Sequence, residues 1–168
     1  MSILTPRLEL RPGSAAAFAA EPHEREALAA AIGATVPESW PVEHYDADPL
    51  TVWRSEIARD ANVVPWLIRY MIERETNVVV GMVGSGGRPS DGTFIIGYSV
   101  LPEYRRRGYA SEALDGLVQW AFGQPEVARI VAYTYPDLAA SIGVLRKTGF
   151  RLVGNGPEEG TIMFERLR

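Results

Sequence analysis

The sequence predicts a mixed α/β (α+β) fold, a largely antiparallel sheet of about six to seven strands flanked by helices. Three apolar segments rich in β-branched or aromatic residues follow one another over residues 65–101 with short breaks, as consecutive antiparallel strands do. Segments with helical spacing over residues 110–122 and 138–147 then alternate with further strand-like segments. The length of 168 residues favours one domain, which we expect to occupy residues 1–168.

The N-terminal third is predicted to hold one strand and three short helices. Residues 7–12 alternate polar and apolar side chains and end at a proline, as in a strand with one buried face. From Ser14 to about Ile32 the chain is alanine-rich and broken at Pro22, which predicts two helices with Ser14 as the N-cap of the first. Residues 49–61 carry apolar side chains at helical steps.

A long connection over residues 36–49 holds three prolines together with Trp40, His44 and Tyr45. Loops of this length are uncommon inside compact domains unless they are functional, so we expect Trp40 and Tyr45 to line a substrate pocket. The alternative is that the two rings only cover the edge of the core.

The middle of the chain is predicted to form a hairpin of residues 65–74 and 78–84, followed by a strand over residues 93–101. The C-terminal part is predicted to hold a strand over residues 128–135 and a helix over 138–147 that ends at Gly149. A closing hairpin follows, formed by residues 150–153 and 161–165.

The connection between the strand at 93–101 and the next helix is the most informative stretch. Pro102 ends the strand, and Arg105, Arg106, Arg107 and Gly108 then lead into an amphipathic helix. A helix N-terminus has unpaired N–H groups and the positive end of the helix dipole, and a glycine lets a ligand approach the backbone. The stretch therefore predicts an anion site, suited to a diphosphate. The alternative is an ordinary solvated run of arginines.

Charge and composition narrow the class of protein. The net charge is −4 and the pI is about 5.3, whereas a nucleic-acid-binding domain is normally basic. There is no cysteine, which excludes disulfides, thiolate metal sites and a cysteine nucleophile, and with two histidines we expect no metal. Because no apolar run reaches membrane-spanning length and no signal-peptide pattern opens the chain, we expect a cytoplasmic protein without membrane or nucleic-acid partners.

Two motifs resemble those of the GCN5-related N-acetyltransferases (GNAT). The turn Arg105-Arg106-Arg107-Gly108-Tyr109-Ala110, with its flanking strand and helix, resembles motif A, Gln/Arg-x-x-Gly-x-Gly/Ala. Residues 140–150, Ala-Ser-Ile-Gly-Val-Leu-Arg-Lys-Thr-Gly-Phe, resemble the second motif in the branch that includes the ribosomal-protein-alanine acetyltransferases. The likeness runs from about residue 5 to the C-terminus.

The resemblance implies a splayed sheet with acetyl-CoA, the acetyl donor, between the strand ending at Leu101 and the strand ending at Tyr135. It implies pantetheine contacts with backbone groups near Tyr98, Ser99 and Val100, and a diphosphate on the amides of residues 106–111. The backbone N–H near Val100 is the natural oxyanion donor. The cofactor-binding residues implied in this way are Tyr98, Ser99, Val100, Arg105, Arg106, Arg107, Gly108, Tyr109, Ala110 and Ser111.

Three positions depart from the family pattern. Leu138 replaces a cofactor-contacting Asn, Leu145 replaces a Tyr that protonates the leaving thiolate, and Ile95 replaces a Glu that is a plausible base. Ser141 is then the best remaining side chain to protonate the thiolate, with water as the other source. The alternative for Ser141 is a hydroxyl bonded back to its own helix.

A general base is not fixed by the sequence, and three side chains are candidates to act through a water: His44, Asp46 and Glu73. The resemblance implies direct acetyl transfer to a primary amine, either a protein N-terminus or a small-molecule amine, by a monomer or homodimer. We expect the acceptor between the Trp40–Tyr45 loop and the hairpin tip at residues 154–160. A non-catalytic acyl-CoA-binding module is the alternative.

Overall fold

A computed structural model describes residues 1–21, 24–42 and 47–168. Its eight strands form a sheet in the order β1-β2-β3-β4-β5-β6-β8-β7, in which only the β5–β6 pair is parallel among the described residues. The strands are β1 (Ile3–Leu4), β2 (Leu8–Pro12), β3 (Arg69–Glu73), β4 (Val78–Gly84), β5 (Thr93–Val100), β6 (Arg129–Thr134), β7 (Arg151–Asn155) and β8 (Ile162–Leu167). The predicted fold class is confirmed, and the two-residue β1 is a strand that the sequence pattern did not indicate.

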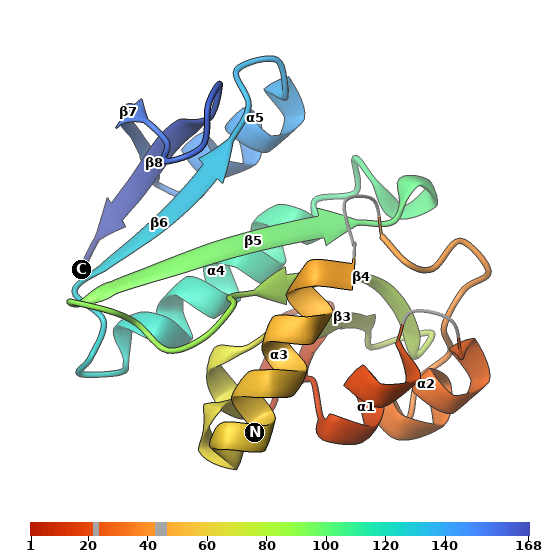
Figure 1. The fold of residues 1–168 in the computed structure, drawn as a ribbon. Coiled ribbons are helices and arrows are strands. Elements are labelled where there is room, and N and C mark those ends of the chain that lie inside the picture. The colour runs from red at the N-terminus through yellow and green to blue at the C-terminus, as the bar shows by residue number, and fades with distance from the viewer. Residues whose placement is uncertain (22–23, 43–46) are drawn as a thin grey trace.

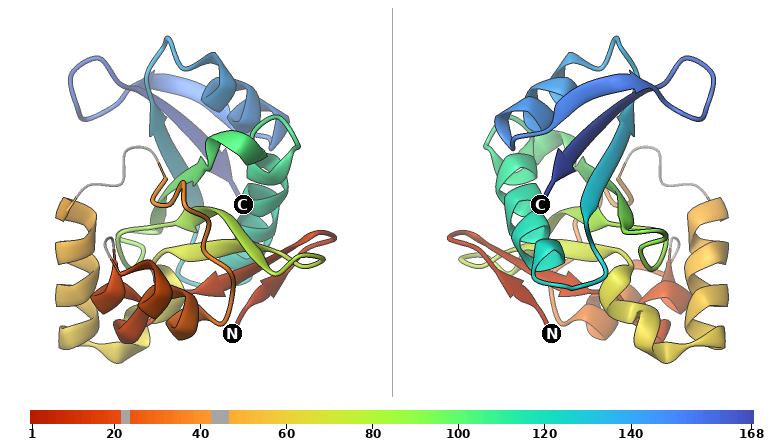
Figure 2. Two further views of the ribbon diagram at one scale, coloured as in Figure 1. Left: turned by 90° about the vertical axis from the view of Figure 1, so that its right-hand side faces the viewer. Right: turned by 90° about the vertical axis from the view of Figure 1, so that its left-hand side faces the viewer.

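Five α-helices and two 3₁₀-helices flank this sheet in the part of the chain that the structure describes. They are α1 (Ala15–Ala20), α2 (Arg25–Ile32), α3 (Ala47–Arg59), η1 (Ala61–Trp66), η2 (Pro102–Tyr104), α4 (Tyr109–Phe122) and α5 (Ala139–Lys147). Helices α1–α3 lie on one side of the N-terminal strands and α4 crosses the other side (Figure 2). No helix of the described ranges has the length and apolar character needed to cross a membrane.

Strand β5 is shared between two partners, and this divides the sheet. Its first half, Thr93 to Ile96, pairs with β6, and its second half, Gly97 to Val100, pairs with β4. Beyond Ile96 the two parallel strands separate, and Figure 1 shows β5 and β6 starting side by side and diverging toward their carboxyl ends. The sheet is therefore splayed between β5 and β6, as the resemblance implied.

Local sequence explains the start of α1 and the end of α5. Ser14 caps α1, with its Oγ accepting a hydrogen bond from the N–H of Ala17 at 3.1 Å. At the end of α5, Gly149 has a φ of 82°, and the N–H of Phe150 donates to the Leu145 carbonyl at 2.9 Å. This is the glycine-dependent helix ending that the sequence predicted.

The predicted strand over residues 65–74 begins later than expected. Residues 61–66 form η1 instead, and β3 starts at Arg69. The Asp60 side chain caps η1 by accepting from the N–H of Asn62 at 2.9 Å. This cap starts the helical turn, which continues through Pro65 to Trp66, so the strand begins only after it.

The β4–β5 pairing depends on a glycine opposite Val100. A Cβ added to Gly81 would lie 2.3 Å from the Ser99 carbonyl oxygen, a backbone atom that cannot move without disturbing the pair. We expect Gly81→Ala to lower the free energy of unfolding by about 2 kcal/mol, measured by urea denaturation. Gly97→Ala is the control, because nothing lies within 4 Å of its added Cβ, and it should change stability by less than about 0.5 kcal/mol. Equal losses in the two variants would contradict this account.

Candidate functional site

The loop between β5 and α4 presents a row of backbone N–H groups. Arg106 and Gly108 have left-handed φ values of 60° and 84°, and Gly108 is the N-cap of α4. Within the described ranges, no hydrogen bond is donated by the N–H groups of residues 106–111. Successive unpaired N–H groups that lead into a helix N-terminus form an anion-binding concavity. The structure thus brings together the residues predicted for the diphosphate.

Two of the three arginines bind backbone carbonyls of the loop and of the strand end before it. The Arg105 Nε donates to the Val100 carbonyl at 3.0 Å, and the Arg107 guanidinium donates to the Glu103 carbonyl at 2.9 Å. The exposed Arg106 guanidinium makes no hydrogen bond or ion pair with the described part of the chain. Arg105 and Arg107 therefore shape the loop as well as adding positive charge to it.

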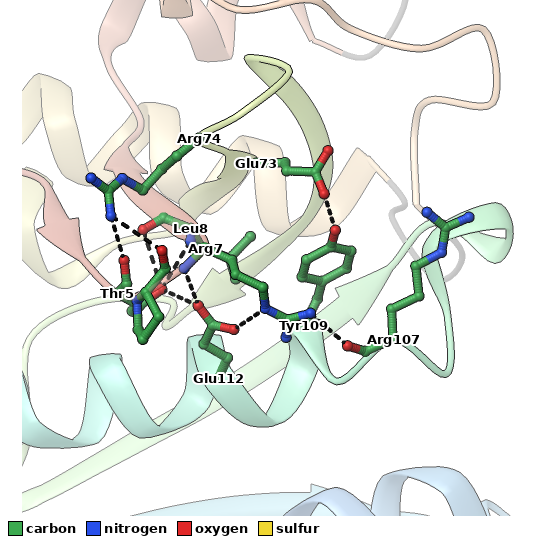
Figure 3. A network of polar contacts seen from close by, with 9 residues as sticks. Thr5, Arg7, Leu8, Glu73, Arg74, Arg107, Tyr109 and Glu112 are labelled. Carbon is green, nitrogen blue, oxygen red and sulfur yellow. Dashed lines mark hydrogen bonds and ion pairs between the residues drawn. The ribbon is translucent and has the colours of Figure 1, made fainter.

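A clamp formed by Arg7 and Glu112 joins this loop to the N-terminal segment (Figure 3). Arg7 donates from its guanidinium to the Arg107 carbonyl at 2.9 Å and from Nε to the Glu112 carboxylate at 2.7 Å. The same carboxylate accepts from the Thr5 hydroxyl at 2.6 Å and from the Arg7 N–H at 2.7 Å. Burial acts to raise the pKa of Glu112, but the hydrogen bonds from Thr5 and Arg7 outweigh it and the pKa is lowered.

The sequence did not indicate this clamp. Arg7 and Glu112 are 105 positions apart, and no spacing rule connects them.

Tyr109 points away from the predicted anion site. Its side chain is buried beneath the Arg7 guanidinium, which lies 4.7 Å from the ring centroid, and its hydroxyl donates to the Glu73 carboxylate. Figure 3 shows this contact at the start of α4. Of the residues predicted for the cofactor, Tyr109 can therefore offer only its backbone N–H.

Glu73 was one of three candidates for the general base. Its carboxylate accepts hydrogen bonds from Tyr109 and from the Thr76 hydroxyl, and these bonds lower its pKa. A lowered pKa makes it a weaker base, so the structure does not favour this assignment. The other two candidates, His44 and Asp46, lie outside the described residues.

Backbone groups of β5 face the opening between β5 and β6. The Leu101 N–H donates to the Val80 carbonyl at 3.0 Å on the β4 side. Since successive N–H groups of a strand alternate between its two edges, the N–H groups of Tyr98 and Val100 point toward β6. Pairing with β6 ends at Ile96, so these two groups face the splay, whereas Ser99 pairs toward β4 opposite Met82.

Tyr98 and Ser141 meet across the same opening. The Tyr98 hydroxyl oxygen lies 3.2 Å from Ser141 Oγ and 3.1 Å from the Ser141 carbonyl oxygen. Burial raises the pKa of Tyr98, and the bond to Ser141 opposes this effect. The bond found for the Ser141 hydroxyl is thus to Tyr98, and its predicted part in catalysis stays a prediction.

The three positions that depart from the family pattern are apolar in different surroundings. Leu145 is fully buried in the core, whereas Leu138 is 42% exposed and Ile95 is 48% exposed. None of these side chains can transfer a proton.

Trp40 packs into the protein core. It is 7% exposed, its Nε1 donates to the Glu21 carboxylate at 2.9 Å, and its ring centroid lies 5.8 Å from that of Tyr70. This position agrees with the alternative in which Trp40 covers the core edge. Tyr45 lies outside the described residues, so the pocket wall that these two residues were expected to form stays a prediction.

Two features near Trp40 were not predicted. Glu21 is a buried carboxylate whose pKa is raised by burial, and it accepts hydrogen bonds from Trp40 and Tyr70. The Ser39 hydroxyl donates to the Glu103 carboxylate, which ties the loop before Trp40 to the loop after β5. The described part of the long connection therefore contacts the candidate site at Ser39.

The tip of the β7–β8 hairpin forms one side of an open cavity of about 600 Å³. Pro136, which follows β6, also lines this cavity, as do the exposed residues Glu158 and Glu159. This is the hairpin segment that was expected to face the acceptor.

Comparison with known families agrees with the motifs and the splayed sheet. Residues 7–151 match the family model of the acetyltransferase (GNAT) domain. The chain belongs to the GNAT family. A curated relative of this GNAT chain is the uncharacterized N-acetyltransferase YjdG of Bacillus subtilis strain 168, 34% identical over 88 residues, which are 52% of this chain and 51% of the relative. The chain thus spans about half the length of the curated relatives it matches.

Solved structures of other GNAT proteins share the fold. A GNAT-family acetyltransferase from Bacillus anthracis superposes with a TM-score of 0.67 at 22% identity, covering 99% of this chain and 98% of that chain. A ribosomal L7/L12 alpha-N-protein acetyltransferase in complex with coenzyme A has a TM-score of 0.67 at 17% identity, covering 99% of this chain and 98% of that chain. At these identities the likeness shows a shared fold.

The lowered pKa of Glu112 predicts a pH-dependent contribution to stability. A carboxyl group whose pKa is lower in the folded state stabilises the fold above its unfolded pKa of about 4.3, and this effect is lost as the pH falls through the folded value. We expect Glu112→Gln to cost about 1 kcal/mol near neutral pH, because its partner Arg7 is half exposed, and to cost little at a pH below the folded value.

Urea denaturation at both pH values measures this difference, and Glu126→Gln serves as the exposed control. A loss that is the same at both pH values would show that Glu112 acts by packing and not by charge.

Proposed function

We propose that this chain is an acetyl-CoA-dependent N-acetyltransferase that passes the acetyl group directly to a primary amine. The observation that carries the proposal is the row of N–H groups of residues 106–111, which have no partner among the described residues and lie at the wide end of the opening between β5 and β6. Membership of the GNAT family supports the same reaction class. Because the chain has no cysteine, it has no thiol that could form an acetyl-thioester intermediate.

The residues present fit acetyl-CoA. The N–H groups of residues 106–111 would hold the diphosphate, with positive charge from Arg106, and the N–H groups of Tyr98 and Val100 would pair with the pantetheine arm. When bound, acetyl-CoA supplies an acetyl group already activated as a thioester. The Val100 N–H, held in place by the β4–β5 pairing, would stabilise the oxyanion without reorganising.

The acceptor class is inferred from the hairpin cavity. Glu158 and Glu159 offer carboxylates to a cationic amine, and a cavity of about 600 Å³ accommodates a small molecule or the end of a peptide. A protein N-terminus and a small-molecule amine both match this chemistry. The likeness to a ribosomal-protein acetyltransferase supports including N-terminal peptides among the acceptors to be tested.

A non-catalytic acyl-CoA-binding module is the second candidate. It is favoured by the apolar residues Ile95, Leu138 and Leu145, which stand where the family carries polar groups. Binding and turnover must therefore be tested separately.

The binding test changes charge at the anion site while keeping side-chain size. Gly108→Asp places a carboxylate at the N-cap of α4, and Gly108→Asn places a neutral side chain of the same shape in the same left-handed conformation. Coenzyme A should raise the Tm of the wild type, and the shift should be lost in Gly108→Asp but largely kept in Gly108→Asn. Equal Tm shifts in both variants would contradict the placement of the diphosphate at this loop.

Turnover is tested by thiol release from acetyl-CoA with a panel of N-terminal peptides and small amines. An acetyltransferase releases free thiol in proportion to the amine added, and the acetylated amine appears in equal amount by mass spectrometry. Binding of coenzyme A without amine-dependent release from any acceptor would favour the binding module.

A further inference from the structure

The contact between Tyr98 and Ser141 joins β5 to α5, the helix that follows the diverging strand β6. Tyr98 lies two residues beyond Ile96, where pairing of β5 with β6 ends, and Ser141 lies in the first turn of α5, the helix that follows β6. Their hydroxyl oxygens are 3.2 Å apart. The pair therefore bridges the opening that the Tyr98 and Val100 N–H groups face.

The two contacts of Tyr98 allow two arrangements of protons. Tyr98 donates either to the Ser141 carbonyl, while the Ser141 hydroxyl donates to Tyr98, or to Ser141 Oγ, which leaves the Ser141 proton free. Tyr98 has one proton and lies within bonding distance of both Ser141 oxygens. When Tyr98 donates to Ser141 Oγ, that oxygen is satisfied as an acceptor and its own proton is free to point elsewhere. Two hydroxyls in this arrangement can pass a proton in one direction, from Tyr98 through Ser141 to a third group.

The surroundings of Tyr98 keep it protonated. The two influences on its pKa are burial, which raises it, and the weaker opposing bond to Ser141, so the phenol holds its proton at neutral pH. Leu145, at the family position of a proton-donating Tyr, is sealed in the core. A proton donor on β5 would thus supply the proton for the leaving thiolate, which the side chain at position 145 of α5 cannot supply.

We propose that Tyr98 is a positioning residue that orients Ser141 and supplies its proton during acetyl transfer, an inference that rests on the proposed function. As the C–S bond of the thioester breaks, its electron pair passes to sulfur, Ser141 Oγ gives a proton to that sulfur, and Tyr98 gives its proton to Ser141 Oγ. Solvent returns a proton to Tyr98, and the proton lost by the amine passes to solvent. The products are an amide and a free thiol, with no net change in charge.

The first test uses the protein without any ligand. The pKa of Tyr98 is measured from the tyrosinate absorbance, as the difference between the wild type and Tyr98→Phe. Ser141→Ala should raise this pKa, because the hydrogen bond that favours the phenolate is lost. Ser99→Ala, which alters the neighbouring hydroxyl on β5, should leave it unchanged. An unaltered pKa in Ser141→Ala would overturn the coupling.

The second test measures turnover with an accepted amine. Tyr98→Phe keeps the ring and should lower kcat by about 10-fold to 100-fold, at or below the lower end of the range for lost acid–base help. The KM for acetyl-CoA and the Tm shift by coenzyme A should stay near wild type. Ser141→Ala should lower kcat at least as much, and the double variant should be no slower than Ser141→Ala, because Tyr98 acts through Ser141.

The leaving thiol separates this role from a purely structural one. With an acetyl thioester of a more acidic thiol, the departing sulfur needs less proton help, so the loss in Tyr98→Phe should shrink. Two results would overturn the proposed proton transfer from Tyr98 through Ser141. One is a kcat loss in the double variant equal to the two single losses combined, and the other is a kcat loss in Tyr98→Phe that does not depend on the leaving thiol. A wild type that releases no thiol overturns the proposed function as well, whereas an active wild type with an unchanged Tyr98→Phe overturns this proton transfer alone.

Discussion

The sharing of β5 between two neighbours is the constraint on which the rest of the site depends. A strand in the middle of a sheet normally pairs on both edges along its whole length, yet β5 pairs with β6 only up to Ile96 and with β4 only from Gly97. The N–H groups of Tyr98 and Val100 are therefore left facing an opening. Unpaired N–H groups of this kind are costly when buried without a partner, which makes the opening suited to a ligand with its own amide groups.

The loop between β5 and α4 is held in shape by residues that are distant in sequence as well as by its own. Gly108 and Arg106 have left-handed φ values, Arg7 and Arg107 bind the carbonyls of Arg107 and Glu103 in the loop, and Arg105 binds the carbonyl of Val100 at the end of β5. Glu112 fixes Arg7 in turn, so the connection between β1 and β2 helps to hold the loop in shape.

The Tyr98–Ser141 contact connects the chemistry to the fold. Helix α5 follows β6, and β6 diverges from β5. A side chain on β5 therefore has to be long to reach across the opening and contact α5. A tyrosine has that reach, and its hydroxyl finds Ser141. The buried Leu145 shows why position in the second motif is not sufficient to assign a role, because the environment of each helical position decides what its side chain can do.

The sequence by itself determined the features that depend on neighbouring residues. The strand–turn–helix around Gly108, the N-cap at Ser14 and the helix ending at Gly149 follow from local backbone preferences, and the two motifs indicated the family. Only the tertiary structure decided the Arg7–Glu112 clamp, the burial of Trp40 against Glu21, and the pairing of Tyr98 with Ser141. These contacts join residues 19 to 105 positions apart, and such distances are set by how strands and helices pack, which leaves no periodic pattern in the chain.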